Sequence, residues 1–267
     1  MRRCIVCALV LAVFAVGAGA GDANGVPSIQ LAASPARVLL VNSGTTTVEV
    51  TNGSRQAVEL AASSLDYDIR RNGRVVVAPH KRPTGSARSW LEVSPNHAEI
   101  PAGHSVAFRV AATVPAGQAV GDHHALLAFT TQPVGTGRIG IRTRLGVSVV
   151  VRVPGPLRRR MSITKARVRG RWLQIGVRNT GNVIERFPPD RIAVQLRRGA
   201  RTRLLHSRAL IVLPGHEAIA AVRLPRLARG RYSAIARLRP ARADPGTPSA
   251  RSVTRRFTIR LPRGAPR

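Results

Sequence analysis

Apolar and polar residues alternate with a period of two along much of the chain, the pattern of β-strands with one buried and one exposed face. Between Ser105 and Val114 every even position is apolar. Between Gly140 and Val153 the alternating apolar residues predict an inward face, and the residues expected to point outward are Arg142, Arg144, Ser148 and Arg152. We therefore expect antiparallel sheets that bury one face.

Further short strands are expected between turn sequences. They lie at Ile29–Ala33, Val38–Val41, Thr46–Thr51, Val58–Asp68, Arg74–Val77, Trp90–Val93, His123–Thr131, Ile219–Leu224 and Tyr232–Leu238. In the second half, one expected strand face contains Leu173, Ile175 and Val177, and another contains Ile192, Val194 and Leu196. The expected last strand contains Val253, Phe257, Ile259 and Leu261, with Arg255 as the exception to its apolar pattern. The sequences between them are rich in Asn, Gly and Pro, which favour tight turns. Regular short strands without a helical period predict an all-β fold built from sandwiches.

The pattern stops at Pro154-Gly155-Pro156 and resumes after Arg160. Two prolines cannot continue a central ladder, so this segment predicts a domain boundary. One β-sandwich takes about 100 residues, and the chain has 267. We expect two tandem immunoglobulin-like β-sandwich domains, at residues 26–154 and 161–262, with a linker at 155–160 and a disordered tail at 263–267.

Residues 1–20 have the three parts of a secretory signal peptide. Arg2-Arg3 provides the positive start, Ile5–Val16 the apolar centre and Ala18-Gly19-Ala20 the cleavage pattern. We expect an exported protein that is secreted or associated with the cell envelope; a retained N-terminal membrane anchor is the alternative. Both cysteines also lie in this segment, so the mature chain is expected to have no disulfide and no thiolate site.

Positive charge is concentrated in the second half of the chain. Residues 25–155 carry 13 Lys+Arg and 7 Asp+Glu, a net +6, whereas residues 156–267 carry 28 and 4, a net +24. One genome encodes both halves, so codon usage does not explain the contrast. Basic residues near an anionic surface contribute about 1 kcal/mol each. The second domain is therefore predicted to bind an anionic polymer, a membrane surface or a protein partner; a merely solvated arginine-rich face is the alternative.

The candidate anion-binding residues crowd the expected strand ends and turns of the second domain. They are Arg158, Arg159, Arg160, Arg167, Arg169, Arg171, Arg197, Arg198, Arg201 and Arg203. Nucleic acid is a poor candidate, because the protein is expected to be exported and aromatic residues for base stacking make up only 3% of the chain. An anionic cell-wall polymer or a membrane surface fits this chemistry better.

No constellation of residues predicts an enzyme, a metal site or a cofactor. Asp122-His123-His124 is the nearest to a metal cluster, but adjacent strand residues point to opposite faces, and a turn followed by a strand explains it. Only 12 Asp and Glu occur, which leaves few pairs for general acid–base chemistry. Asn52-Gly53-Ser54 matches a glycosylation sequon, although Asn-Gly favours a hairpin turn here.

Several segments resemble those of known envelope proteins. Thr45–Ser54 resembles an early hairpin of pilus-chaperone-like sandwiches. Trp90–Pro95, Ile100–Gly103 and Val114–His124 follow in the order seen in the first domain of WxL-interacting surface proteins of the DUF916 type. Val177–Asn182 resembles an Asn-x-Gly-Asn hairpin of their second domain. This resemblance implies a two-sandwich envelope protein that binds wall polymer, such as peptidoglycan, through its first domain and a partner through its second.

The resemblance to pilus chaperones implies a different site. Those chaperones hold the C-terminal carboxylate of a client with two basic residues, on the first and last strands of their first domain. Arg37 and Arg144 occupy comparable places, and paired cations bind a carboxylate through charge-assisted hydrogen bonds. Their alternative role is that of outward residues in an arginine-rich protein. The Val134–Ile139 turn is short where such chaperones have a long client-binding loop.

Two functions therefore remain open. The first is a non-enzymatic cell-envelope binding or scaffold protein. The second is a pilus-type secretion chaperone that caps client subunits by strand pairing. The expected last strand of the first domain, Ile141–Val153, distinguishes them, because a chaperone leaves its edge open for a client strand and a scaffold covers it.

Overall fold

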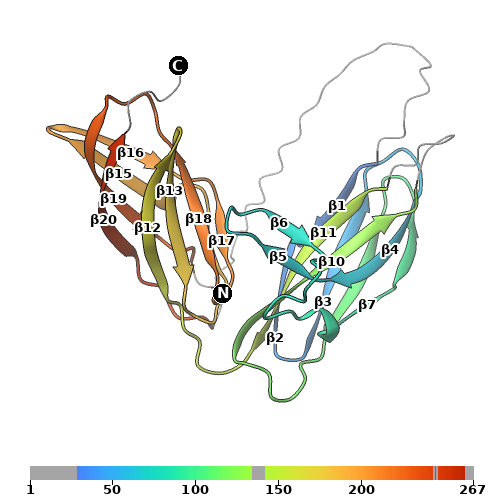
Figure 1. Cartoon of the computed structure of the whole chain (residues 1–267). Helices are drawn as coiled ribbons and strands as arrows, with labels where there is room; N and C mark the ends of the chain where they lie inside the picture. Colours follow the sequence, from blue (N-terminus) through green and yellow to red (C-terminus); the bar gives the residue numbers. More distant parts are fainter. Residues whose placement is uncertain (1–28, 134–141, 243, 245, 262–267) are drawn as a thin grey trace, which may run out of the picture.

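Two β-sandwiches joined in series form a V-shaped molecule in the computed structural model, with the first on the right and the second on the left of Figure 1. The structure describes residues 29–133, 142–242, 244 and 246–261. The only helix in that part of the chain is a single 3-10 turn, η1 (Arg88–Trp90). It contains no helix long and apolar enough to span a membrane. The predicted all-β fold class is confirmed.

The first sandwich consists of a four-stranded sheet, in the order β1-β3-β9-β7, and a five-stranded sheet, in the order β2-β11-β10-β4-β8. The strands of the first sheet are β1 (Leu31–Ser34), β3 (Gly44–Asn52), β7 (Leu91–Ser94) and β9 (Ser105–Ala112). Those of the second are β2 (Arg37–Val41), β4 (Val58–Leu65), β8 (His97–Ile100), β10 (Gly121–Thr131) and β11 (Arg144–Val153). A separate hairpin, β5 (Tyr67–Ile69) and β6 (Val75–Val77), extends toward the second sandwich.

The core of the first sandwich confirms the predicted alternation. On β9, Phe108 and Val110 are fully buried, while Ser105 and Arg109 are exposed. Phe108 packs against Phe129 of β10, in the opposite sheet, with the ring centroids 4.8 Å apart. Aliphatic residues fill most of the remaining core, because the chain has few aromatic residues.

The chain changes sheets between β1 and β2, and this places β2 beside β11. β1 pairs antiparallel with β3, whereas β2 pairs in parallel with β11, with Arg37 opposite Ser148. The inward face predicted for β11 is confirmed, since Val149 and Val151 are fully buried. The prediction that Arg152 points into solvent is wrong, because groups of the second sandwich contact its face of β11 and Arg152 is only 3% exposed.

The second sandwich has a three-stranded sheet, a four-stranded sheet and a two-stranded ribbon, in the orders β12-β13-β18, β16-β15-β19-β20 and β14-β17. The three-stranded sheet contains β12 (Met161–Arg169), β13 (Trp172–Asn179) and β18 (Glu217–Arg223). The four-stranded sheet contains β15 (Ile192–Arg198), β16 (Arg201–His206), β19 (Gly230–Leu238) and β20 (Val253–Leu261). The ribbon contains β14 (Glu185–Phe187) and β17 (Leu210–Val212).

The second core follows the alternation of its strands. Leu173 and Ile175 of β13 and Ile192 and Leu196 of β15 are buried, as their shared faces predict. Arg255 breaks the apolar pattern of β20 for a structural reason. Its Nη1 donates hydrogen bonds to two backbone oxygens of β12.

Each sandwich contains a buried asparagine that holds a turn. Asn52 is 0% exposed, and its side-chain amide donates to the backbone oxygen of Ile100 at 2.9 Å. Asn179 makes the same kind of contact in the second sandwich, to the oxygens of Val183 and Val212. The segment after Asn52 is a bend in which the Asn52 Oδ1 accepts from the backbone N–H of Ser54 at 2.9 Å. The expected hairpin turn is wrong, because β3 and β4 on either side of this segment belong to different sheets.

Some expectations have no structural counterpart to compare. The signal peptide at 1–20, the Val134–Ile139 turn and the tail at 263–267 lie outside the described residues. Conversely, β8, β12, β14, β16 and β17 were not among the expected strands. These segments are short or rich in arginine, and the period of two is weak in them.

Candidate functional site

A small apolar contact lies at the junction of the two sandwiches. Tyr67 and Ile69 of β5 and Val150 of β11 pack against Ile184 and Leu213 of the second sandwich. All five are buried. Apolar contact has no preferred direction, so the polar contacts around this cluster define how the domains meet.

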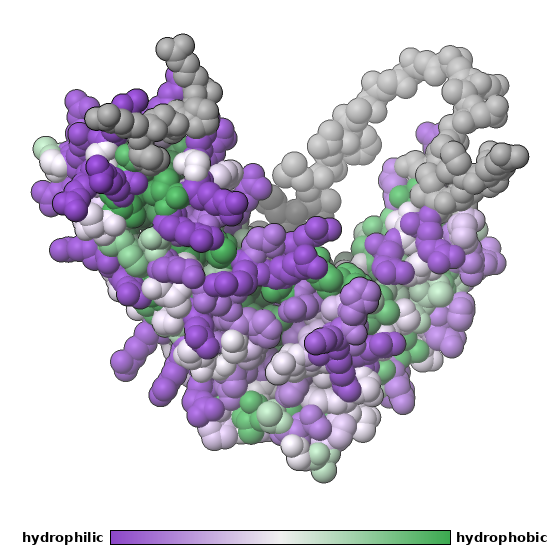
Figure 2. Space-filling model, in the orientation of Figure 1, coloured by the Kyte–Doolittle hydropathy of each residue, from purple (hydrophilic) through white to green (hydrophobic). Residues whose placement is uncertain are grey.

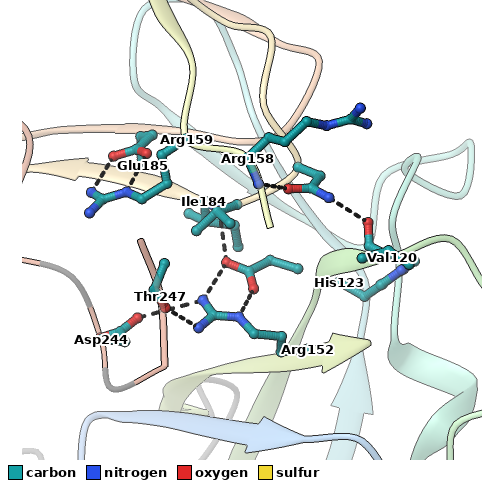
Figure 3. Close-up of polar contacts among 12 residues, drawn as sticks. Val120, His123, Arg152, Arg158, Arg159, Ile184, Glu185, Asp244 and Thr247 are labelled. Carbon is teal, nitrogen blue, oxygen red and sulfur yellow. Dashed lines mark hydrogen bonds and ion pairs between the residues drawn. The ribbon is translucent and has the colours of Figure 1, made fainter. Parts of the chain in front are cut away.

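A buried ion pair lies at this junction (Figure 3). Arg152 of β11 donates from Nε and Nη2 to the carboxylate of Asp122, its register partner on β10, at 2.6 and 3.1 Å. The two side chains are 3% and 1% exposed. The backbone N–H of Ile184 donates to the same carboxylate at 2.8 Å, and Arg152 donates to the hydroxyl of Thr247. Asp122 therefore links the domains, a role that its place in a turn sequence did not predict.

Asn182 fastens the segment between the domains. Its Oδ1 accepts from the backbone N–H of Arg158 at 2.6 Å, and its Nδ2 donates to the oxygens of Val120 and Pro156 at 3.1 Å each. Gly121 lies directly against it, since a Cβ at this position would overlap the backbone oxygen of Asn182. The close approach of the two sandwiches requires glycine here.

Arg159 forms a second buried ion pair. Its Nε and Nη2 donate to the carboxylate of Glu185 on β14 at 2.7 and 2.6 Å, and the side chains are 5% and 0% exposed. The prediction that Arg159 binds an external anion is wrong, because its guanidinium already faces this buried carboxylate. Arg158 and Arg160, on either side of it, are exposed.

Arg37, at the start of β2, also faces a carboxylate from the other sandwich. Its Nη1 and Nη2 donate to Asp244 at 3.1 and 2.8 Å. Asp244 lies between β19 and β20, in the segment Arg239–Arg251 that the sequence predicts as a long loop. Hydrogen bonds from Arg37 hold the pKa of the Asp244 carboxyl below its ordinary value, although burial opposes this. The side chains are 31% and 29% exposed, so water reaches this pair.

Arg186 of β14 brings another cation to Arg37. Burial, and then the charge of Arg37, hold the pKa of the Arg186 guanidinium below its ordinary value. Among the described residues no carboxylate forms an ion pair with Arg186. The Nε of Arg37 is buried and also lacks a hydrogen-bond partner there. A cavity of about 70 Å³, called here the cleft, has Arg37, Arg186 and Asp244 in its wall.

The structure does not bring Arg37 and Arg144 together. Arg144 lies at the far end of β11, exposed, and its Nε donates to Thr130 at 3.3 Å. Ser148 stands opposite Arg37, and Arg144 lies four positions before Ser148 on the strand, about 13 Å away. The prediction that Arg37 and Arg144 together bind a client carboxylate is therefore wrong. The additional cation beside Arg37 is Arg186, from the second sandwich.

Strand β11 has an open edge next to this cleft. Its Ser148–Arg152 half pairs with β2, but no strand within the described residues pairs with Arg144–Val147 on that side. A cavity of about 510 Å³ lies here, with Ile29–Ala32 and Thr143–Leu145 in its wall. Unpaired backbone N–H and C=O groups at such an edge can form a ladder with another strand. Part of the predicted Ile141–Val153 strand therefore has the edge expected of a chaperone.

The β5–β6 hairpin makes a second bridge between the sandwiches. Arg71, at its turn, donates to Glu217 of β18 at 2.6 Å, and its backbone oxygen accepts from the N–H of Ile219 at 2.6 Å. Burial would raise the pKa of the Glu217 carboxyl, but the hydrogen bond and charge of Arg71 hold it below its ordinary value. The domains thus meet through this hairpin as well as through the linker.

The histidine pair at the start of β10 is buried. His124 donates from Nε2 to the backbone oxygen of Tyr67 at 3.1 Å, and burial holds the pKa of its imidazole below its ordinary value. His123 packs on Trp90, with ring centroids 4.5 Å apart. No group of three or more His, Cys, Asp or Glu side chains suited to a metal ion occurs in the described part of the chain.

The other candidate anion-binding arginines lie on two hairpins of the second sandwich that point away from the junction in Figure 1. Arg167, Arg169 and Arg171 belong to the β12–β13 hairpin, and Arg197, Arg198, Arg201 and Arg203 to the β15–β16 hairpin. All seven are exposed. They form no part of the cleft.

No protein-family model and no curated protein matches the sequence. Solved structures match its fold over both domains. A chain of the chaperone–tip adhesin complex of CFA/I fimbriae has a TM-score of 0.51 at 14% identity, over 85% of this chain and 98% of that one. The YadV chaperone has a TM-score of 0.50 at 10% identity, over 85% and 99%. The chain has the two-domain immunoglobulin-like fold of pilus chaperones. These comparisons support the resemblance to pilus chaperones and give no support to the resemblance to WxL-interacting proteins.

Sequence reasoning missed most of the residues at the junction. Arg152 fits the outward pattern of its strand, while Glu185 and Asp244 lie in short or irregular segments. One signal was available in the charges. Glu185, Glu217 and Asp244 are three of only four carboxylates in the second half, and each pairs with an arginine at the junction.

Proposed function

We propose that this protein is an exported, non-enzymatic chaperone that holds a partner polypeptide by its C-terminal carboxylate and by strand pairing at the edge of β11. The observation that carries the proposal is the Arg37–Arg186 pair of cations beside the open Arg144–Val147 edge. The fold supports it, since one similar structure is that of a chaperone–tip adhesin complex. A scaffold that binds wall polymer through the first domain has no comparable observation behind it.

The positions of the cations and the edge define how a client would lie. β11 runs from Arg144 toward Ser148, which stands opposite Arg37. A client chain that ends at Arg37 and pairs with Arg144–Val147 therefore runs parallel to β11. Main-chain hydrogen bonds supply affinity, and the terminal carboxylate fixes the register.

Asp244 occupies the place that a client carboxylate would take at Arg37. An incoming carboxylate either adds at Arg186 or displaces Asp244 from Arg37. In both cases it offsets the repulsion between Arg37 and Arg186, which adds to burial in holding the pKa of Arg186 below its ordinary value. Asp244 is therefore an internal competitor of the client.

Peptide binding tests this proposal. The probe is an extended peptide of alternating apolar residues with a free C-terminal carboxylate, and the same peptide amidated at its C-terminus is the control ligand. Arg37→Gln and Arg186→Gln should each weaken binding of the free acid roughly tenfold to a hundredfold, because a hydrogen bond to a charged group contributes about 1.5–3 kcal/mol. Asp244→Asn should strengthen binding, because it removes the competitor.

Arg109→Gln is the matched control variant, since it removes an exposed arginine from β9, which lies in the other sheet of the first sandwich and outside the client-binding edge. Its affinity for the free-acid peptide should stay within about fivefold of the wild type, the range expected for an exposed charge. Equal binding of acid and amide peptides, or unchanged affinity in both Arg37→Gln and Arg186→Gln, would contradict the carboxylate site.

A further inference from the structure

A second cluster of arginines lies at the outer end of the second sandwich, away from the cleft. It lines a cavity of about 430 Å³ whose wall consists of Leu196, Arg198, Arg201, Arg203, Arg226, Leu227, Ala228 and Tyr232. Figure 2 shows hydrophilic side chains gathered on this end of the molecule, at the upper left. The wall has four cations and no carboxylate.

The strand register places arginine where the hydrophobic core would otherwise continue. Leu196, buried on β15, has Arg203 opposite it on β16, and Arg198 has Arg201 opposite it. Alternate residues of a strand share a face, so these three arginines continue the inward row that contains Leu196. Tyr232 of the adjacent β19 is buried and also lines the cavity. The core therefore ends in a layer of guanidinium groups.

Arg198 is held at the wall of this cavity. Its Nη1 donates to the backbone oxygen of Arg229 at 2.5 Å, and its guanidinium carbon lies 5.6 Å from the centroid of the Tyr232 ring. Gly230 provides the room, because a Cβ there would meet the Arg198 guanidinium at 3.2–3.5 Å. The guanidinium thus has a defined position before any ligand binds, which lowers the entropy lost on binding.

The carboxylates of this sandwich all lie elsewhere. Glu185, Glu217 and Asp244 pair with arginines at the domain junction, and Asp190 lies 3.6 Å from His206. These are the four acidic residues of the second half of the chain. Within the described residues, no carboxylate offsets the repulsion among the arginines of the cavity.

We infer that this cavity, called here the arginine pocket (Arg198, Arg201, Arg203 and Arg226), binds a phosphate-bearing ligand. The guanidinium fork matches the oxygens of a phosphate group with two parallel hydrogen bonds. The volume of about 430 Å³ suits a lipid headgroup or a small phosphorylated molecule. Leu227 and Tyr232 provide an apolar surface for the carbon skeleton of the ligand. The pocket is separate from the cleft and does not depend on the proposed function.

Titration of the intact protein tests this inference with two probes, inorganic pyrophosphate and phosphatidylcholine vesicles with or without phosphatidylglycerol. The test variant carries Arg198→Gln, Arg201→Gln and Arg203→Gln. The matched control carries Arg167→Gln, Arg169→Gln and Arg171→Gln, which remove the same charge from the other hairpin. The pocket variant should lose about a hundredfold in affinity, at about 1 kcal/mol per arginine. The control should lose less than about fivefold.

The two probes distinguish the source of the phosphate. Pocket-dependent binding of pyrophosphate indicates a soluble phosphorylated ligand, and pocket-dependent binding of vesicles alone indicates a lipid headgroup; either result supports the inference. Equal losses in the two triple variants would overturn it, because net charge alone would then explain binding. Absence of binding to both probes would also overturn it. Peptide binding at the cleft should be unchanged in the pocket variant, and this separates the two sites.

Discussion

Replacing Asp122 by alanine should destabilise the protein strongly, because it leaves the positive charge of Arg152 buried without its main partner. The two side chains are 1% and 3% exposed, so solvent cannot take the place of the lost carboxylate. The same substitution removes the acceptor of the Ile184 N–H, which belongs to the other sandwich. One change therefore disturbs both the first sandwich and the junction.

The expected magnitude follows from the bonds that are lost. Removing one partner of a buried ion pair costs about 3–5 kcal/mol, and an unsatisfied buried N–H adds about 1–3 kcal/mol. Thr247 and Asp244 still reach the Arg152 guanidinium, which compensates in part. We therefore expect a loss near the lower end, about 4 kcal/mol. At about 2–4 °C per kcal/mol, the melting temperature should fall by roughly 10 °C.

Urea and thermal unfolding of the intact protein, followed by circular dichroism, measure this loss. Arg144→Ala is the control, because it removes an exposed arginine from the same strand and should change the free energy of unfolding by no more than about 0.5 kcal/mol. The double variant Asp122→Leu with Arg152→Met should recover much of the loss, since an apolar pair of similar volume often replaces a buried ion pair at little cost. A loss below about 1 kcal/mol for Asp122→Ala would refute this reasoning.

Two further predictions concern the same junction. Gly121→Ala should lower the melting temperature more than Gly103→Ala. Both glycines have a positive φ, at 125° and 73°, but only at Gly121 would the Cβ overlap the backbone of Asn182. Equal losses in the two variants would contradict the close contact. Because burial holds the pKa of His124 below 6.5, the unfolded chain binds more protons below that pH. Stability should therefore fall as the pH drops from neutral, by at most about 1.4 kcal/mol per pH unit. His124→Gln should flatten this dependence in melts across that range, and an identical pH profile in the variant would exclude His124 as its origin.

The regular part of the fold follows from the sequence, because the faces of long strands are set by burial alone. On β9 and β13 the period of two identifies the buried residues, including Phe108 and Ile175, since a shift by one residue would expose the whole face. Arg152 shows the limit of this logic. Its strand is covered on both faces where the second sandwich lies against it, and nothing local in the sequence records that contact.

The candidate site was predictable only in part for a related reason. Arg37 could be found, because the resemblance to pilus chaperones places a basic residue on the first strand of the first domain. Its neighbours Arg186 and Asp244 come from the other sandwich, more than a hundred residues later in the chain. Pairing across a domain junction depends on the packing of whole domains, and alternation along a single strand gives no information about it.

The proposed carboxylate site is shared between the two domains. Arg37 belongs to the first sandwich, whereas Arg186 and Asp244 belong to the second. A carboxylate bound by Arg37 and Arg186 would therefore contact both domains and stabilise the arrangement that brings them together. The Arg152–Asp122 pair and its bond from Ile184 hold the same junction without a client. Asp122→Ala should therefore lower the affinity for the free-acid peptide as well as the stability of the fold, although Asp122 is not among the residues lining the cavity beside Arg37.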